Sequence, residues 1–437
     1  MRVLIQLRYS LPTHEASRNR MPAPGLGVHL ESTISGLSID PDYPPIQLPG
    51  VRPATGGHLF SASQPMQFSM EPAQSTYIVR GQIPDGGPQA AAHPDVVGIY
   101  SDPVIESCLT CGGTPPVGSD ADVAKQLGAT RLAANKMNGA GVYLAVVDTG
   151  INVAHLQAKG RNPVLDVQRS WTPKGVATTP GKHPVNHGTM CAYDTGIMAP
   201  KATLLDYAVL LSNTPGATVM AGLLSDAVLA YSKLRTILQA MPATKRALVV
   251  SNSWGMFSPA WDFPPGHPGN YSDNPAHPFN IMVGSLAAAG ADILFAAGNC
   301  GHDCPDGRCA FGGSHPICGA NSHPAVLSLA GVDTKRNRVG YSSQGPGRLT
   351  SHKPDLAAYT HFKGSGVYPA DRGTSAACPV AAGVVAAVRT KYSASKLTPH
   401  QLGALLFKSA IDRGGTGYDY DYGWGIVDPL KLLTMLP

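Results

Sequence analysis

Apolar runs alternate with helix-like stretches through about three quarters of the chain. The runs VYLAVVD, TLLDYAVLL, ALVVSNSWG, DILFAAG and AVLSLAGV predict strands, and residues 217–240 and 279–289 predict helices. Such alternation favours an α/β fold with a parallel sheet covered by helices on both faces. In open sheets of this kind, binding sites form beyond the carboxyl ends of the strands. Polar residues that directly follow the apolar runs are therefore candidates for function.

A different pattern occupies the N-terminal part of the chain. MRVLIQLR and STYIVRGQIP predict strands, and AAAHPDVVGIYSDPVIES predicts a short helical turn followed by a strand. Residues 11–75 are rich in Pro, Gly, Ser and His with little periodicity, which predicts loops between short strands. We therefore expect a small α+β domain over residues 1–110, a linker over 111–120 and a larger domain over 121–437. The length of 437 residues also favours two domains.

Four polar residues have the side chains that acyl transfer requires. Asp148 follows an apolar run, and His187 and Ser375 each open an apolar, helix-compatible stretch. A serine hydroxyl is a poor nucleophile, so it needs a nearby base and a carboxylate that orients the base. Asn299 offers a side-chain amide to the oxyanion of a tetrahedral intermediate. Because Pro379 is tolerated only near the start of a helix, it places Ser375 at a helix N-terminus, where the dipole favours negative charge.

The segments VVDTGI, HGTMCA, FAAGN and GTSAACPVAAG, taken in this order, resemble the subtilisin-like serine proteases. The resemblance extends from about Ala121 to YGWGIVDPLKLL near the C-terminus. It implies a subtilisin-like sheet flanked by helices and hydrolysis of peptide bonds through an acyl-enzyme on Ser375. It also implies His187 as general base, Asp148 as its orienting carboxylate, and Asn299 with the Ser375 backbone N–H as oxyanion donors. No cofactor is required for this chemistry.

The same resemblance implies that an extended polypeptide substrate binds by strand addition. The implied substrate-binding residues are Ser251, Asn252, Ser253, Trp254, Gly255, Ala296, Ala297 and Gly298. Trp254 is bulky where the family usually has a smaller residue, so it either narrows a substrate pocket or serves packing. Backbone hydrogen bonds are sequence-neutral, so selectivity must come from pockets.

YIVRG and HPDVVGIYSDPVIE resemble the inhibitory prodomain that precedes such catalytic domains. This resemblance implies a zymogen in which the chain's own N-terminal domain is an intramolecular inhibitor, with self-cleavage between about Ile105 and Asp120. A permanently attached or unrelated recognition domain is the alternative. For the whole protein, two other functions stay open: a peptide ligase or macrocyclase that uses the same acyl-enzyme, and a non-catalytic peptide-binding module.

Eight cysteines raise the question of disulfides or metal. Four follow Asn299 closely and are expected to form two disulfides with one another; they are Cys300, Cys304, Cys309 and Cys318. Zinc ligation is the rival interpretation, which their spacing disfavours because it lacks paired C-x₂-C knuckles. Cys108 and Cys111 predict a local disulfide or two free thiols. Cys191 and Cys378 lie in apolar runs and are expected to be inert packing residues.

Composition narrows the partners. Charged residues make up only 14% and the net charge is +5 without a basic run, which argues against nucleic acid as a partner. No apolar stretch reaches the ~18 residues that a membrane span requires. The N-terminus shows no secretion signal, which favours the cytoplasm, whereas disulfides would favour an extracellular or periplasmic location.

Calcium often accompanies the family that these motifs resemble. The segment DRGGTGYDYDYG, from Asp412 to Gly423, presents carboxylate oxygens of the kind that calcium binds. It matches no EF-hand spacing, and an exposed acidic turn is the favoured interpretation. Structural calcium is therefore possible, and no metal ligand is assigned.

Overall fold

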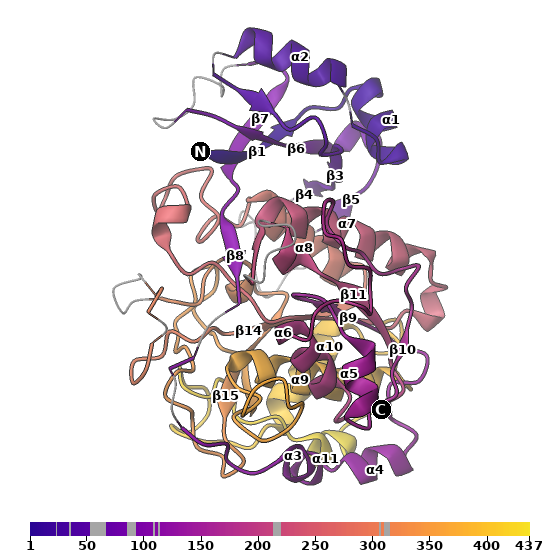
Figure 1. The fold of residues 1–437 in the computed structure, drawn as a ribbon, viewed down its shortest axis with the longest axis vertical. Coiled ribbons are helices and arrows are strands. Elements are labelled where there is room, and N and C mark those ends of the chain that lie inside the picture. The colour runs from indigo at the N-terminus through magenta and orange to yellow at the C-terminus, as the bar shows by residue number, and fades with distance from the viewer. Residues whose placement is uncertain are drawn as a thin grey trace.

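The structure is a computed structural model. It describes residues 1–22, 24–34, 36–52, 67–84, 93–107, 110–111, 114–212, 220–305, 307–309 and 315–437. These residues form a smaller N-terminal unit and a larger α/β unit, and strand β8 (Val104–Glu106) runs from the first onto the second (Figure 1). Among them, no helix combines the length and hydrophobicity needed to cross a membrane.

The larger unit is built on a seven-stranded parallel sheet with the order β10-β11-β9-β13-β14-β15-β16. Its strands are β9 (Tyr143–Val147), β10 (Val164–Leu165), β11 (Thr203–Tyr207), β13 (Leu248–Asn252), β14 (Ala291–Ala296), β15 (Leu327–Val332) and β16 (Leu356–Tyr359). The central strands are buried and apolar along their whole length, as a parallel sheet covered on both faces requires. The α/β fold predicted from the alternating runs is confirmed; β10 and β16 were not predicted.

Helices cover both faces of this sheet. On one face α6 (His187–Thr195) and α9 (Thr374–Arg389) share a core with Leu144 and Val146 of β9. On the other face α7 (Leu224–Ala240) and α8 (Pro278–Ala288) share a core with Ala145 and Val147. Alternate residues of one strand thus serve opposite cores. The remaining helices are α3 (Asp120–Gln126), α4 (Ala129–Ala134), α5 (Val153–Ala158), α10 (Pro399–Ser409) and α11 (Pro429–Leu433).

One helix boundary differs from the sequence prediction. The helix expected over 217–240 begins at Leu224, because Ala221–Leu223 forms strand β12, which pairs antiparallel with β8. Residues 217–219 lie outside the described part of the chain. A strand of three residues carries too short a pattern to be recognised in sequence, and its partner decides its conformation.

The N-terminal unit is an antiparallel sheet with the order β2-β6-β1-β7 and β3 beside β6. Its strands are β1 (Arg2–Leu7), β2 (Ser38–Ile39), β3 (Ile46–Leu48), β6 (Thr76–Gln82) and β7 (Val96–Ser101), and β4 (Gly50–Arg52) pairs separately with β5 (Gln67–Ser69). Two helices, α1 (Leu11–Asn19) and α2 (Pro24–Thr33), pack beside the sheet (Figure 1).

The prediction of loops between strands over residues 11–75 was therefore wrong for α1 and α2. Ser10 caps α1 by accepting the Thr13 N–H, and a proline lies in the first turn. Leu30 of α2 is fully buried against the sheet. Helices this short bury few side chains, so their apolar periodicity is weak and tertiary packing stabilises them.

The N-terminal sheet lies on α7 and α8 (Figure 1). Leu4 and Ile78 belong to the same buried cluster as Tyr231 of α7. Polar contacts surround the start of α7: the Asp102 carboxylate accepts the Ser225 N–H at 2.7 Å, and Arg80 pairs with Asp226 at 3.0 Å. The two units therefore share one continuous interface of apolar contacts, hydrogen bonds and an ion pair.

This interface predicts a pH-dependent stability. Burial raises the pKa of Asp102 from 3.8 to about 6, with Asp226 adding to the rise, while the Ser225 hydrogen bonds and Arg80 lower the pKa. A raised pKa means that the ionised carboxylate destabilises the folded protein, a cost absent below about pH 4 and complete above about pH 6. We expect Asp102→Asn to raise the free energy of unfolding at pH 8 by at most about 3 kcal/mol, and therefore to raise the unfolding temperature. At pH 4 we expect no such gain. Calorimetry showing the same gain at both pH values would contradict this.

Candidate active site

Asp148 and His187 form a buried hydrogen-bonded pair. Asp148 directly follows β9, and His187 is the first residue of α6, whose start is capped by the Asn186 side chain. The His187 Nδ1 lies 2.8 Å from the Asp148 Oδ1, and the two residues are only 5% and 1% exposed. Because an ionised carboxylate only accepts hydrogen bonds, Nδ1 donates and Nε2 is left to accept a proton.

Ser375 is the second residue of α9 and is buried. Pro379 has no N–H to donate to the Ser375 carbonyl, four residues earlier in the helix. That carbonyl instead accepts the Ser253 hydroxyl at 3.0 Å and the Cys191 thiol at 3.5 Å. The Ser375 hydroxyl itself makes no hydrogen bond to the described residues. Side chains from two other segments thus hold the first turn of α9. The Ser375 hydroxyl is not used in holding this turn.

Asn299 lies beside Ser375, just beyond the end of β14. Its Oδ1 accepts both the Thr374 backbone N–H at 2.9 Å and the Thr374 hydroxyl at 3.0 Å, which fixes the orientation of the amide. Gly373 has a φ of +81°, and a Cβ there would lie 2.9 Å from the Asn299 Nδ2 and 3.4 Å from both the backbone N and the Oγ of Ser375. The space beside Gly373 is therefore bordered by an amide, a backbone N–H and a hydroxyl.

Cys191 and Cys378 are buried, as expected. Burial raises the pKa of Cys378 to about 12. Burial, followed by the Asp148 carboxylate, raises the pKa of Cys191 well above its usual value, so this thiol stays protonated. Its Sγ lies 3.7 Å from the Asp148 Oδ2 and 3.8 Å from the His187 Nδ1. Cys191 thus does more than pack, because its thiol lies between the Ser375 carbonyl and the carboxylate that holds His187.

Asp148, His187, Ser375 and Asn299 were predicted from the sequence, and the structure brings them to the carboxyl edge of the sheet or the adjoining helix starts. Gly373 and Thr374 were not predicted as functional residues. The glycine and threonine of the GTS motif were the available signal. Cys191 and the Ser253 hydroxyl stabilise the first turn of α9 through tertiary contacts with the Ser375 carbonyl, which no local sequence motif predicts.

Among the expected substrate-binding residues, Gly255 has a peptide-like partner. It exchanges both backbone hydrogen bonds with Glu106, at 2.9 and 3.0 Å. The opposite edge of β8 pairs with β12. Residues 104–106 therefore form a strand between two segments of the larger unit. This is the arrangement that strand addition produces.

The other expected residues lie nearby but face the protein interior. Ser251 and Asn252 are buried in β13, where their side chains contact the Cys378 Sγ at 3.7 Å and the Leu294 carbonyl at 3.0 Å. Trp254 is 1% exposed, and its ring packs against Phe279 and Phe295. Of the two interpretations of Trp254, the structure supports packing.

Ala296, Ala297 and Gly298 lead from β14 to Asn299 and are buried. The Ala297 N–H donates to the Leu329 carbonyl at 2.9 Å. The Gly298 N–H donates to the Thr374 hydroxyl at 3.0 Å. These bonds hold the segment that positions Asn299 rather than presenting its donors to a substrate.

The cysteines pair differently from the prediction. Disulfides join Cys300 to Cys309 and Cys111 to Cys304, whereas Cys318 is a buried thiol. The prediction that the four cysteines after Asn299 form two disulfides with one another was therefore wrong. The prediction of a local disulfide or a free thiol at Cys111 was also wrong, because Cys111 of the linker bonds to the segment between Cys300 and Cys318, here called the insertion. Cys108 itself lies outside the described residues. Three of the four sulfurs proposed as zinc ligands, those of Cys300, Cys304 and Cys309, are bonded in disulfides and do not offer a thiolate to zinc.

The acidic segment between Asp412 and Gly423 does not fit a calcium ion. The Asp419 carboxylate accepts the backbone N–H groups of Gly415, Asp421 and Tyr422, and Asp412 accepts that of Gly417. These oxygens already stabilise a turn. The segment therefore supplies no set of carboxylates directed at a common point.

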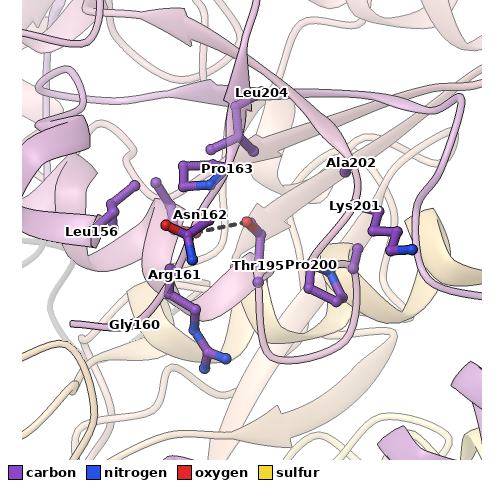
Figure 2. Close-up of a pocket in the computed structure, with 13 residues that line it drawn as sticks. Leu156, Gly160, Arg161, Asn162, Pro163, Thr195, Pro200, Lys201, Ala202 and Leu204 are labelled. Atoms are coloured by element: carbon purple, nitrogen blue, oxygen red, sulfur yellow. Dashed lines mark hydrogen bonds between the residues drawn. The ribbon is translucent and has the colours of Figure 1, made fainter. Parts of the chain in front are cut away.

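A pocket of about 330 Å³ lies at the C-terminal end of α6, away from His187 at its start. Figure 2 shows the apolar Leu156, Pro163 and Leu204 and the charged Arg161 and Lys201 among the residues that line it. It is separate from the residues that surround Ser375.

The sequence is similar to that of known proteases. The sequence profile of the subtilase family matches residues 139–425. Subtilisin DY of Bacillus licheniformis is 26% identical over 69% of this chain and 93% of its own length. Fervidolysin of Fervidobacterium pennivorans is 24% identical over 69% of this chain and 42% of its own length. A calcium-dependent protease of Nostoc sp. is 27% identical over 68% of this chain and 47% of its own length.

The match thus spans less than half of two of these relatives and nearly all of the third. The profile alone covers well over half of the present chain, including Asp148, His187, Asn299 and Ser375. The chain belongs to the subtilase family.

Proposed function

We propose that this protein is a serine endopeptidase that cleaves its own N-terminal domain from its catalytic domain. The observation that carries the proposal is the buried Asp148–His187 hydrogen bond of 2.8 Å. It is supported by the space beside Gly373, which is bordered by the Asn299 amide and by the Ser375 backbone N and hydroxyl. One group of residues thus offers a base, a nucleophile and two oxyanion donors.

In the proposed reaction the Ser375 Oγ attacks the peptide carbonyl while the His187 Nε2 takes its proton. Asp148 holds the ring and stabilises the imidazolium, and the oxyanion receives hydrogen bonds from the Asn299 Nδ2 and the Ser375 N–H. His187 then protonates the leaving amine, and water hydrolyses the acyl-enzyme. The Ser375 hydroxyl makes no hydrogen bond to the described residues in this structure. We expect its bond to His187 to form when the scissile peptide is in place, since such bonds often tighten only in the reacting complex.

We further propose that residues 1–110 are an inhibitory prodomain, 111–120 the linker, and 121–437 the catalytic domain. Support comes from β8, which pairs with β12 and Gly255 on the larger unit and so occupies the place of an extended substrate. The sheet of the N-terminal unit packs on α7 and α8 and holds β8 there. A peptide cannot enter this strand position while β8 remains.

The disulfides and the relatives bear on the compartment and on calcium, respectively. Two disulfides favour an oxidising compartment. Some of the relatives are named calcium-dependent proteases, and a structural calcium is compatible with a reaction that needs no cofactor. Because the carboxylates of the acidic segment are engaged by backbone N–H groups, no calcium ligand is proposed there.

Self-cleavage depends on Ser375 under this proposal. We expect the purified wild-type chain to lose roughly its first 105–120 residues with time, the window set by β8 and the linker. The Ser375→Ala chain is expected to stay whole, because it lacks the nucleophile. Intact-mass spectrometry measures both and separates hydrolysis from transfer to an added amine. Equal cleavage of the two chains would show that another protease is responsible.

The oxyanion donors make a separate prediction for substrate hydrolysis. Asn299→Ala is expected to lower kcat about 10²- to 10³-fold, the magnitude known for subtilisin itself. Gly373→Ala is expected to lower kcat as well, because its methyl group would occupy the space between the Asn299 amide and Ser375. Steady-state kinetics on an unstructured protein substrate measures both.

Gly141→Ala is the matched control for the backbone. Gly141 has a φ of +77°, close to the +81° of Gly373, but its Cβ would meet nothing within 4 Å. We expect this variant to leave kcat unchanged, because a methyl group at Gly141 meets no other atom within 4 Å and so displaces no catalytic group. A comparable loss of kcat in the Gly141 and Gly373 variants would contradict the oxyanion assignment.

The disulfide between Cys111 and Cys304 locates the cut. Because Glu106 and Ser107 are the last described residues bound in the cleft before Cys111, cleavage is expected between Ser107 and Cys111. The N-terminal fragment should then separate on a denaturing gel without reductant. If release requires reductant in the wild type but not in Cys111→Ser, the cut lies beyond Cys111.

A further inference from the structure

The chain's own β8 segment shows how a bound peptide would meet the insertion that follows Asn299. Glu106 pairs through its backbone with Gly255, and β12 lies on the opposite side of the strand. Backbone pairing of this kind accepts any sequence. The side chain of Glu106, by contrast, meets one particular residue of the insertion.

That residue is Arg308. Its guanidinium donates to the Glu106 carboxylate through Nη1 and to the Ser107 carbonyl through Nη2, the latter at 2.7 Å. The Arg308 and Glu106 side chains are 30% and 16% exposed, so water screens this ion pair only in part. Arg308 thus makes one hydrogen bond that the backbone of any peptide offers and one ion pair that requires an acidic side chain.

The position of Arg308 is fixed by the insertion itself. Arg308 directly precedes Cys309, which forms a disulfide with Cys300. Because Cys300 directly follows Asn299, the disulfide holds Arg308 close to the candidate site. Its guanidinium carbon also lies 5.5 Å from the centre of the buried Phe257 ring, two residues beyond Gly255. A cation held over an aromatic face loses little additional freedom when a carboxylate binds.

We propose that Arg308 forms a specificity subsite that selects polypeptide substrates with an acidic residue at the position occupied by Glu106. This inference rests on the proposed endopeptidase function and adds its substrate class. In the uncleaved chain the same ion pair holds β8 in the cleft. After removal of the N-terminal domain, a substrate would take the places of Glu106 and Ser107 beside the guanidinium.

The first test measures docking without catalysis. In full-length Ser375→Ala, hydrogen exchange followed by mass spectrometry reports protection of residues 104–107 and 253–255. Glu106→Gln and Arg308→Gln should each speed exchange in both segments, and the charge swap Glu106→Arg with Arg308→Glu should restore protection. Arg169→Gln, which removes a surface ion pair with Asp166, is the matched control and should change neither segment.

The second test measures selectivity on the self-processed wild-type protein. The probe is a quenched fluorogenic peptide with the sequence of residues 102–113, its cysteines replaced by serine, and matched peptides carrying Gln or Lys in place of Glu106. A partly exposed charge-assisted bond predicts kcat/KM about tenfold higher for the Glu peptide than for the Gln peptide. Arg308→Gln should abolish this preference, and Arg308→Glu should favour the Lys peptide.

The outcomes separate the two proposals. Equal hydrolysis of the Glu and Gln peptides by the wild type, or unchanged exchange in the Arg308 variant, overturns the acidic subsite and leaves the endopeptidase function standing. No hydrolysis of any peptide, together with no labelling of Ser375 by a fluorophosphonate, overturns the endopeptidase function. In that case the exchange experiment alone decides whether Arg308 binds an acidic side chain.

Discussion

The close packing of α9 against α6 and the parallel sheet is the constraint on which the candidate site depends. Every residue of α9 is buried, and small residues fill most of it. At Gly383 a Cβ would lie 2.5 Å from the Thr195 carbonyl oxygen of α6, so a larger residue would push the helices apart. Because α6 begins with His187 and α9 carries Ser375 in its first turn, this packing fixes the base relative to the nucleophile.

Helix α9 is tied to strand β14 and its continuation at both ends. At its start, Thr374 donates two hydrogen bonds to Asn299, just beyond β14. At its end, Arg389 makes a buried bidentate ion pair with Asp292 near the beginning of β14, at 2.5 and 2.6 Å. Buried charges need such partners, since an unpaired one is costly. The oxyanion donor and the nucleophile thus belong to one rigid pair of antiparallel elements.

The N-terminal unit and the insertion after Asn299 form a second, connected system. The Cys111–Cys304 disulfide joins the linker to the insertion, and the Cys300–Cys309 disulfide closes the loop that carries Arg308. The contacts of β8 with β12 and Gly255 lie between them. Under the two proposals, inhibition, processing and selectivity would share the same few residues.

The sequence by itself determined the parallel α/β sheet, the place of Asp148 after a strand and that of Ser375 at a helix start, because apolar runs, strand ends and a helix-starting proline act locally. The short helices of the N-terminal unit were not predicted from the sequence, since tertiary packing stabilises them and their apolar periodicity is weak. Only the tertiary structure decided that Trp254 packs inward, that Cys304 bonds to a distant linker cysteine, and that Arg308 meets an acidic side chain. The disulfide and the ion pair join residues far apart in the chain, and the burial of Trp254 likewise depends on other segments, so no local pattern encodes these features.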